Sequence, residues 1–351
     1  SFLPVQFIIK KSLIIIFFLT LFPITKSYSE SNNFEDYGII AIMYHRFNEN
    51  KYPSTNIRID DFTKHINLIK AENLMFIKAE DFENHINSKN IERKILLTID
   101  DGFESFYLNA WPILKAERIP FILFVSTREV GANNYMNWDQ IREIAKEDFV
   151  HIGNHSHTHE YLVDRTKREI EEDIKKSMAI FKKELGFNSP FFSYPFGEYS
   201  LEFKKIIKDL NFKYAFGQHS GVADESKDLF ELPRFPINEK YGEIKRFKSI
   251  LKTLPFKYEE ITPKEKYINN STNPPDVRIK FYKNIKNINL ISCYSNEDNE
   301  WRKSNIKFIN EYEVQILLEG KFTTERGRIN CSLQDNGFWR WLGIQFVVAE
   351  N

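Results

Sequence analysis

The feature that most constrains the fold is an alternation of short apolar segments with amphipathic segments between residues 38 and 216. The apolar segments are rich in β-branched and aromatic residues and end in turn-forming residues, which is typical of buried strands. Strands that alternate with helices predict a parallel sheet, and roughly six or seven such units predict an α/β fold, a closed or nearly closed (β/α) barrel, over residues 38–258. The expected strands are 38–44, 73–77, 95–99, 121–125, 149–153, 191–194 and 214–216, and the expected helices are 104–115, 138–145, 166–185 and 201–210, with two more starting near residues 60 and 79.

The pattern changes after Pro255. Residues 259–276 contain three prolines among Asn, Ser and Thr, which predicts a linker. Short alternating segments follow and predict an antiparallel, sandwich-like β domain over residues 277–351. The tryptophans of this domain, Trp301, Trp339 and Trp341, fit either a core or a glycan-binding surface.

The N-terminus has the organisation of an export signal. Two lysines, Lys10 and Lys11, precede an apolar run over residues 13–24, and small residues follow at Ser27 and Ser29. This pattern predicts a signal peptide over residues 1–29, a linker at 30–37, and an exported protein that is periplasmic or extracellular. The alternative is an uncleaved run that anchors the protein to the membrane.

The cysteine content and the charge add two expectations. An even pair of cysteines in an exported protein, here Cys293 and Cys331, predicts a disulfide, with two free buried thiols as the alternative. The 49 basic residues equal the 49 acidic residues, so the composition does not point to a nucleic-acid partner, for which a basic surface is expected.

Two adjacent carboxylates, Asp100 and Asp101, directly follow the apolar segment 95–99, and Gly102 follows them. Both are therefore expected at the C-terminal end of a strand, where barrels of this kind carry their active sites. Two like charges there raise the free energy unless a cation or a shared proton relieves them. A plain turn is the alternative interpretation.

Three histidines, His155, His157 and His159, lie within five residues directly after a later predicted strand. Two imidazoles and one carboxylate make a three-ligand site with an open position for water, as in catalytic zinc sites. With His155, His159 and Asp101 as ligands, Asp100 stays free to act as a general base toward a water whose pKa the metal lowers. Exposed loop histidines are the alternative.

These two motifs resemble those of the polysaccharide deacetylase family, carbohydrate esterase family 4. Residues 98–102 match its T-F-D-D-G motif with Ile in place of Phe, and residues 155–159 match H-[S/T]-x-x-H. The resemblance spans about residues 38–256 and implies a distorted (β/α)7 barrel with a divalent metal, usually zinc. It further implies hydrolysis of N-acetyl groups, or sometimes O-acetyl groups, on polymeric amino sugars. By this match Asp100 is the base, and the metal ligands are Asp101, His155 and His159.

The chain departs from the third family motif, R-x-P-Y, which aligns with residues 193–196. Ser193 stands where the family has the Arg that orients the base, and Phe196 stands where it has Tyr. The backbone N–H of Phe196 can still stabilise an oxyanion, because that role needs no side chain. Arg234 is the candidate for the missing guanidinium, and a surface arginine is the alternative.

The family motif L-x-H, which supplies a general acid, has no counterpart after residue 197. His219 is the only downstream histidine and follows a predicted strand, so it is the candidate acid; a loop histidine is the alternative. The candidate substrate-binding residues are His45, Trp138 and Tyr194. An aromatic such as Trp138 can stack on a sugar face, although a structural histidine and a core tryptophan are the alternatives for His45 and Trp138.

The expected function is metal-dependent N-deacetylation of an acetylated polysaccharide or glycan, with Zn2+ or another divalent transition metal as cofactor. One alternative is an O-acetyl esterase that acts on a polysaccharide. The other is a non-catalytic glycan-binding protein with a degenerate barrel, which the missing motif Arg favours and the complete ligand set disfavours. Association with the cell envelope follows from the predicted export.

Overall fold

The computed structural model describes residues 34, 36–89 and 92–350. The predicted signal peptide and most of the linker at 30–37 therefore lie outside the described residues. Within the described ranges, no helix combines the length and the apolar character that a membrane span requires.

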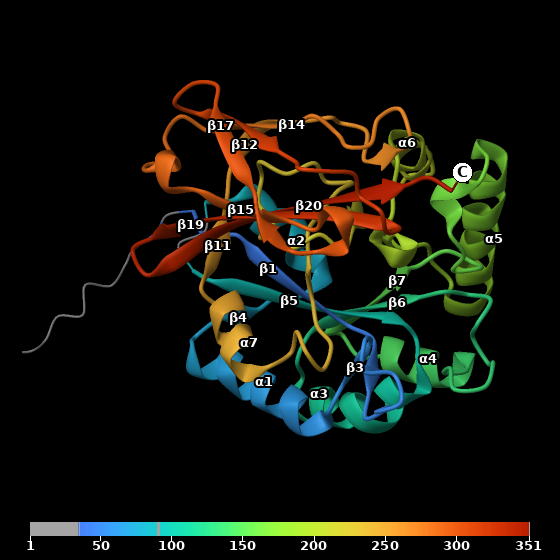
Figure 1. Ribbon diagram of the computed structural model, residues 1–351. Coiled ribbons are helices and arrows are strands. Elements are labelled where there is room, and N and C mark those ends of the chain that lie inside the picture. The colour runs from blue at the N-terminus through green and yellow to red at the C-terminus, as the bar shows by residue number, and fades with distance from the viewer. Residues whose placement is uncertain (1–33, 35, 90–91, 351) are drawn as a thin grey trace, which may run out of the picture. The chain divides into compact units, whose positions relative to one another are not determined.

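A parallel sheet forms the barrel, as the alternation of strands and helices predicts (Figure 1). Its strand order is β10-β1-β5-β6-β7-β8-β9, and β4 pairs with the first residues of β5. Leu232 forms a bridge to Phe216 of β9, and β10, which follows Leu232 closely, pairs with β1, so one segment connects the two edges of the sheet. The predicted distorted (β/α)7 barrel is confirmed. The strands are β1 (Ile39–Tyr44), β4 (Met75–Phe76), β5 (Lys94–Asp101), β6 (Phe121–Val125), β7 (Val150–Asn154), β8 (Phe191–Ser193), β9 (Tyr214–Phe216) and β10 (Phe235–Pro236), with a separate pair β2 (Arg46–Phe47) and β3 (Asn56–Ile57).

The helices of the barrel have ends that the local sequence encodes. Helix α5 begins with a capping box formed by Thr166 and Glu169 and ends at Gly186, whose φ is 82°. Helices α1, α3, α4 and α7 lie along the same face of the sheet (Figure 1). The helices are α1 (Ile59–Ala71), α2 (Phe82–Asn87), α3 (Trp111–Glu117), α4 (Trp138–Ala145), α5 (Lys167–Leu185), α6 (Leu201–Asp209) and α7 (Ile244–Ile250), with short turns η1 (Ala79–Asp81), η3 (Leu162–Asp164) and η4 (Pro195–Gly197).

The helix expected at 104–115 contains an irregular segment. This helix starts at residue 104 as predicted, runs through a π-helical segment, η2 (Phe106–Ala110), and continues as α3 from Trp111. Pro112 stands in the first turn of α3. Because proline has no N–H to bond to the preceding turn, it starts a new helical segment instead of continuing one.

The pleat of β5 decides which side chains reach the interior. Ile95, Leu97 and Ile99 pack in a cluster with residues of the surrounding helices α1 and α4. Leu96 packs in a second cluster with residues of β1, β8 and β9. Because side chains alternate along a strand, Asp100 shares the face of Leu96 and points toward the inside of the barrel.

The C-terminal part forms two sheets that share one core, so the predicted sandwich-like domain is confirmed. The first sheet has the order β11-β20-β19-β15-β16 with β13 paired to β20, and the second has the order β12-β14-β18-β17. The strand pairs within residues 277–351 are antiparallel, as predicted. Two strands that precede residue 277, β11 and β13, add to the first sheet by running parallel to β20. The strands are β11 (Thr253–Pro255), β12 (Tyr258–Thr262), β13 (Tyr267–Ile268), β14 (Val277–Phe281), β15 (Ser292–Ser295), β16 (Arg302–Lys303), β17 (Asn305–Phe308), β18 (Glu313–Leu317), β19 (Arg326–Asp335) and β20 (Phe338–Val348), with turns η5 (Ile288–Leu290) and η6 (Glu297–Asn299).

The domain boundaries at 258/259 and 276/277 stay a prediction. Strands β12 and β13 lie in the segment expected to be a linker, and β11, from the predicted barrel range, pairs with β20. Of the C-terminal tryptophans, Trp301 and Trp339 are exposed. Trp341 packs against the barrel core, and its Nε1–H donates to the Ser220 hydroxyl at 2.7 Å.

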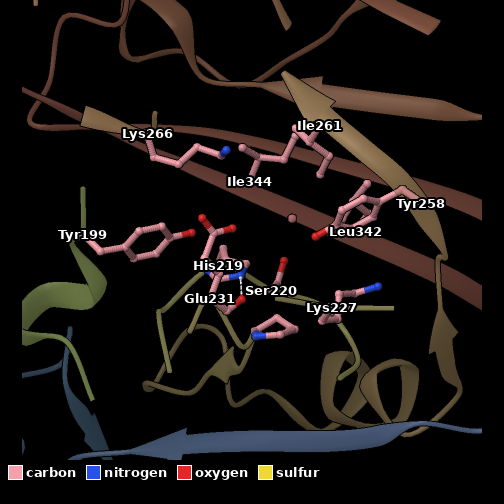
Figure 2. Close-up of a pocket in the computed structure, with 13 residues that line it drawn as sticks. Tyr199, His219, Ser220, Lys227, Glu231, Tyr258, Ile261, Lys266, Leu342 and Ile344 are labelled. Atoms are coloured by element: carbon pink, nitrogen blue, oxygen red, sulfur yellow. Dashed lines mark hydrogen bonds between the residues drawn. The ribbon is translucent and has the colours of Figure 1, made fainter. Parts of the chain in front are cut away.

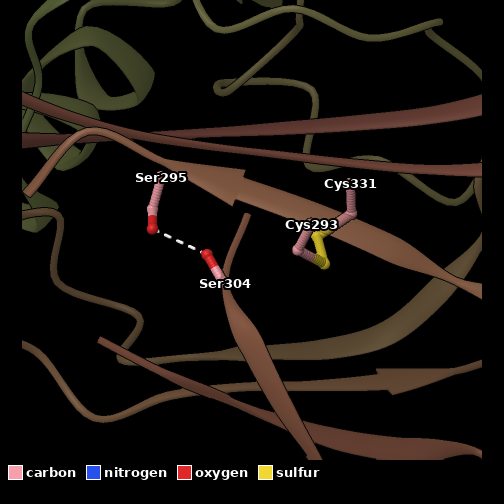
Figure 3. Close-up of a disulfide and its surroundings, with 4 residues drawn as sticks. All are labelled: Cys293, Ser295, Ser304 and Cys331. Atoms are coloured by element: carbon pink, nitrogen blue, oxygen red, sulfur yellow. Dashed lines mark hydrogen bonds between the residues drawn. A yellow bond between two sulfur atoms is a disulfide. The ribbon is translucent and has the colours of Figure 1, made fainter. Parts of the chain in front are cut away.

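Cys293 of β15 and Cys331 of β19 stand directly opposite each other and form a disulfide (Figure 3). The predicted disulfide is therefore confirmed. Their sequence separation is 38, so the bond ties together distant parts of the C-terminal domain and restricts its unfolded chain.

Replacing both cysteines by alanine is expected to lower the free energy of unfolding by about 2–4 kcal/mol, because the cross-link restricts the unfolded ensemble. Denaturant unfolding measures the change. Ser304→Ala is the matched local control, since the Ser304 hydroxyl shares a hydrogen bond of 2.6 Å with the Ser295 hydroxyl beside the disulfide. The control should cost about 1 kcal/mol, and an equal cost for both variants would contradict the cross-link explanation.

Candidate metal centre and active site

The two adjacent carboxylates separate at the end of β5. Asp100 stays on the inner face and is fully buried. Asp101 leaves the strand with a φ of 79°, and 14% of its side chain is exposed. A positive φ is strained for a residue with a side chain. The turn continues through Gly102, whose φ is also 79°, and it brings the Asp101 carboxylate to the histidines that follow β7.

Helix α5 holds the histidine loop in place. The Asp173 carboxylate accepts hydrogen bonds from the His157 N–H at 2.8 Å and from the Thr158 hydroxyl at 2.6 Å. The His157 ring bonds through Nδ1 to the Thr127 hydroxyl at 2.9 Å. His159 adopts a positive φ of 52°. In this loop the middle histidine is engaged elsewhere, and the first and last histidines come together.

The candidate ligand atoms converge on one point. The Nε2 atoms of His155 and His159 each lie 3.1 Å from Asp101 Oδ1, and the three atoms lie within 4.8 Å of one another. His155 donates from Nδ1 to the Ser193 carbonyl at 2.6 Å, so its Nε2 presents a lone pair to the carboxylate. Within the described part of the chain, neither this Nε2 nor Asp101 Oδ1 has a hydrogen-bond partner. A cation between two such atoms relieves their repulsion, so the donor set fits a divalent metal.

The charges of the site favour the ionised form of Asp101. Burial opposes its ionisation, but the imidazoles of His159 and His45 hold its pKa well below the usual range. Burial alone would lower the pKa of His159. The effect of the Asp101 carboxylate is larger, so the pKa of His159 is raised above its usual value. Asp101 is therefore a carboxylate at neutral pH, which is the form that binds a metal ion.

Arg234 and Asp100 form a fully buried, bidentate ion pair. Nη1 donates to Oδ1 at 2.7 Å, and Nη2 donates to Oδ2 at 2.9 Å. The Ser193 hydroxyl donates to Asp100 Oδ2 at 3.1 Å and accepts from Arg234 Nη2 at 2.9 Å. A surface position for Arg234 is therefore excluded. A guanidinium does lie against the carboxylate, and it comes from a different segment than the third motif.

The remaining donors of Arg234 are also engaged, which fixes the orientation of the pair. Nε donates to the Gly217 carbonyl at 2.9 Å, and Nη1 also donates to the Thr98 hydroxyl at 3.1 Å. Burial opposes the ionisation of Asp100, but Arg234 and then His155 bring its pKa below the usual value. Asp100 Oδ2 lies 3.8 Å from His155 Nε2. An ionised, immobilised carboxylate thus stands next to the candidate ligand set.

Phe196 lies in a strained turn beside the same set. Its φ is 60° within η4. Its ring packs edge to face against His159 with centroids 4.8 Å apart, and it stacks on Tyr161 at 4.2 Å. The Gln345 side chain of β20 donates to the Phe196 carbonyl at 3.4 Å. The C-terminal sheet therefore contacts the turn that carries the candidate oxyanion donor.

His219 lies in a different cavity from the ligand set. This cavity, of about 20 Å³, is lined also by Tyr199, Lys227 and Lys266 (Figure 2). Nε2 of His219 donates to the Glu231 carbonyl at 2.9 Å, and burial lowers the pKa of His219 to about 4. A neutral imidazole whose N–H is already bonded has no proton to give at neutral pH. The structure does not bring His219 to the carboxylates, and these contacts do not support its role as the acid.

The three candidate substrate-binding residues lie in different surroundings. Burial lowers the pKa of His45, and the charges of both carboxylates raise it in part, so His45 belongs to the same electrostatic group. Trp138 packs edge to face on Phe181, with ring centroids 6.4 Å apart, and against the main core, as expected for the alternative of a core tryptophan. Tyr194 is fully buried, and its hydroxyl donates to the Phe230 carbonyl at 2.9 Å. His45 thus stands at the same end of the sheet as the carboxylates, because the preceding Tyr44 pairs with Ile99 of β5, whereas Trp138 and Tyr194 pack in the core.

Two residues near the site carry no sequence signal that would have selected them. Tyr161 stands two positions after the histidine motif, where nothing in the pattern distinguishes it from a loop residue. Gln345 is part of a continuous β20 strand, and only the tertiary fold shows that its side chain reaches the turn at Phe196.

Comparison with known proteins gives consistent matches. Residues 87–215 match the family model described as polysaccharide deacetylase. The chain is 22% identical over 269 residues to the poly-beta-1,6-N-acetyl-D-glucosamine N-deacetylase of Staphylococcus epidermidis, covering 67% of this chain and 93% of that relative. The structure of IcaB from Ammonifex degensii matches with a TM-score of 0.57 at 22% identity, covering 62% and 98% of the two chains. The Streptococcus pyogenes deacetylase PplD in complex with acetate matches with a TM-score of 0.54 at 23% identity, covering 58% and 94%.

The matched region contains the chemistry described above. Residues 87–215 include β5 with its carboxylate pair, the histidine loop and β8 with Ser193, whereas Arg234 lies beyond them. The solved structures share the barrel fold. Together with the two motifs, these matches confirm the predicted resemblance to the polysaccharide deacetylase family, which the family model places in residues 87–215.

Proposed function

We propose that the protein is a metal-dependent hydrolase that removes N-acetyl groups from a polymeric amino sugar. The convergence of Asp101, His155 and His159 beside the buried pair of Asp100 and Arg234 carries this proposal. The S. epidermidis relative is named for N-deacetylation of poly-beta-1,6-N-acetyl-D-glucosamine. We therefore take an acetylated glucosamine polymer as the substrate class.

The proposed ligands of the metal are Asp101, His155 and His159, and zinc is the proposed ion because two imidazoles and one carboxylate are typical of its catalytic sites. When bound, such an ion polarises a carbonyl and lowers the pKa of a water from about 15.7 toward 7. The Nδ1–H bond of His155 to the Ser193 carbonyl supports this role, because it orients the ring and directs Nε2 at the site.

Asp100 is the proposed general base. Its pKa is lowered, so it is ionised and can accept a proton, and Arg234 prevents it from rotating. In the proposed reaction, a water oxygen bonds to the acetamide carbon and its proton passes to Asp100. The Phe196 N–H donates to the oxyanion that forms. The C–N bond then breaks, the amine nitrogen takes up a proton, and acetate and a free amine remain.

His45 is proposed to line the site as a neutral imidazole, because burial lowers its pKa. It follows β1, whose last residue Tyr44 pairs with Ile99 of β5, so it stands at the same end of the sheet as the carboxylates. His45 is not one of the candidate ligands, but the charges of Asp101 and Asp100 both act to raise its pKa.

We also propose that the protein acts outside the cytoplasm, at the cell envelope. The support is the basic pair Lys10–Lys11 followed by the apolar run and Ser27 and Ser29. A polymer substrate fits this location, because the S. epidermidis relative is named for a polysaccharide.

Removal of the metal is expected to abolish acetate release from β-1,6-linked N-acetylglucosamine oligomers, and Zn2+ is expected to restore it. Asp101→Ala and His155→Ala should each lose bound metal as well as activity, because each removes one of three ligands. Acetate assays and metal analysis of the purified variants measure the two effects.

His157→Ala is the matched control, since its ring bonds to the Thr127 hydroxyl and is not part of the ligand set. It should keep the metal and the activity. Chelator-resistant acetate release would refute metal dependence. Release from O-acetylated but not N-acetylated oligomers would replace the N-deacetylase proposal with the esterase alternative, and binding without release would indicate a glycan-binding protein.

A further inference from the structure

A row of aromatic rings leads outward from the candidate ligand set. The rings of His155 and His159 lie 4.8 Å apart, and Phe196 packs against His159 at the same distance. Tyr161 stacks on Phe196 with an interplanar angle of 9°. The row therefore begins at two candidate metal ligands and ends at a tyrosine.

Tyr161 is exposed, with 41% of its surface accessible. Within the described part of the chain, it is the exposed large aromatic residue that stacks on a ring in contact with a candidate ligand. One face of its ring covers Phe196, so the exposed area belongs to the rest of the ring. A flat apolar surface open to water at the edge of a site is suited to contact with another apolar surface.

The C-terminal sheet holds this aromatic pair in place. Gln345 of β20 donates to the carbonyls of both Phe196 and Gly197 at 3.4 Å. Arg326 of β19 pairs with the buried Glu198 at 3.1 Å, and its guanidinium carbon lies 5.5 Å from the centre of the Phe196 ring. A surface that is rigid before binding loses little conformational entropy when a ligand arrives.

Charged groups lie near the exposed ring, since the guanidinium carbon of Arg326 is 5.5 Å from the centre of the Phe196 ring that Tyr161 covers. The charges that act on the Tyr161 hydroxyl include those of Glu325, Arg326 and Glu198. Carboxylates accept hydrogen bonds and guanidinium groups donate them. A flat ring beside donors and acceptors matches a pyranose, which has an apolar face of C–H groups and hydroxyls at its edge.

We propose that Tyr161, supported by Phe196, is the binding site for a pyranose ring that neighbours the reacting ring in the polymer. This inference rests on the proposed function, because it takes the Asp101–His155–His159 centre as the position of the reacting acetamide. The site gives the enzyme a preference for chains over single sugars. The C-terminal domain contributes by fixing the turn that carries Phe196.

Comparison of chain lengths tests the proposal. The substrates are N-acetylglucosamine itself and its β-1,6-linked pentasaccharide. Tyr161→Ala should lower kcat/KM for the pentasaccharide roughly tenfold, mainly through KM, the size of effect expected for one aromatic contact. The same variant should leave kcat/KM for the single sugar within about twofold, because that substrate does not reach Tyr161. Tyr161→Phe should behave like the unmodified protein, since stacking needs the ring and not the hydroxyl.

Tyr294→Ala serves as the matched control, because Tyr294 is 46% exposed on β15 of the C-terminal sheet. It should change neither substrate. An equal loss on both substrates for Tyr161→Ala would overturn the proposal and indicate a general effect on the site. No loss on the pentasaccharide would overturn it as well.

A binding measurement separates this inference from the proposed function. In the Asp100→Asn background, which turns the substrate over at least about 10²-fold more slowly, Tyr161→Ala should raise the Kd for the pentasaccharide roughly tenfold in a calorimetric titration. If the unmodified protein releases no acetate, the deacetylase proposal fails, while this titration still decides whether Tyr161 binds the chain. An unchanged Kd would refute the Tyr161 site even in an active enzyme.

Discussion

Asparagine in place of Asp100 is expected to lower kcat/KM for acetate release by at least about 10²-fold while the protein keeps its metal. The amide has the size of the carboxylate and can keep the hydrogen bond with the Ser193 hydroxyl, but it cannot take a proton from water. The metal is retained because Asp100 is not one of the three candidate ligands. Steady-state kinetics and metal analysis of the same preparation measure the two outcomes.

The matched control is Asp139→Asn on α4, whose side chain is 89% exposed. It should leave the kinetics unchanged. Thermal unfolding of both variants shows whether a loss of activity reflects a loss of fold. Activity of Asp100→Asn within a few-fold of the unmodified protein would contradict the assignment of the base.

Removal of the Arg234 side chain is expected to lower the free energy of unfolding by about 3–5 kcal/mol, because it leaves the buried Asp100 carboxylate without its partner. The two side chains are both 0% exposed, and the guanidinium makes two bonds to the carboxylate. Arg234→Lys should recover only part of the loss, since one ammonium group cannot make the bidentate contact. Denaturant unfolding at neutral pH measures both variants.

The effect of Arg234→Ala should depend on pH with a definite sign. Burial opposes the ionisation of Asp100, and Arg234 lowers its pKa below the unfolded value. The stability from the pair is therefore present above the unfolded pKa and is lost as the pH falls through the lower folded value. The difference between Arg234→Ala and the unmodified protein should shrink in acid. A pH-independent deficit would contradict this explanation.

A partly exposed ion pair provides the control for charge removal. Arg302 contacts Glu319 at 2.7 Å, and their side chains are 27% and 54% exposed. Arg302→Ala should cost no more than about 1 kcal/mol, because water solvates the charge that remains. A cost for Arg234→Ala as small as this would overturn the role assigned to the buried pair.

Much of the barrel could be predicted because its signals are local. Strand β6 and helix α4 have the bounds that their apolar patterns predict. The capping residues Thr166 and Gly186 mark both ends of α5 in the sequence itself. The carboxylates and histidines were found for the same reason, because each cluster directly follows an apolar strand and parallel strands end at one edge of the sheet.

The rest of the site depends on tertiary contacts that a linear pattern does not encode. Arg234 stands between short bridging segments and carries no strand or helix signal, although the missing Arg at Ser193 pointed to a replacement. His219 follows β9 as expected, yet the sequence does not say which way a loop side chain turns, and its ring points into a separate cavity. Gln345 reaches the turn at Phe196 only because the C-terminal sheet packs there.

The position of Arg234 links the closure of the barrel to the formation of the ion pair that orients Asp100. The segment that joins β9 to β10 both connects the edges of the sheet and delivers the guanidinium to Asp100. During synthesis the carboxylates and histidines leave the ribosome before this segment does, and domains fold as they emerge. A nascent or truncated chain that ends before Arg234 would carry all three candidate metal ligands, but its Asp100 would lack the guanidinium that orients the carboxylate and keeps it ionised. Catalytic competence would then arise late, at the step that closes the barrel, which keeps incomplete chains inactive.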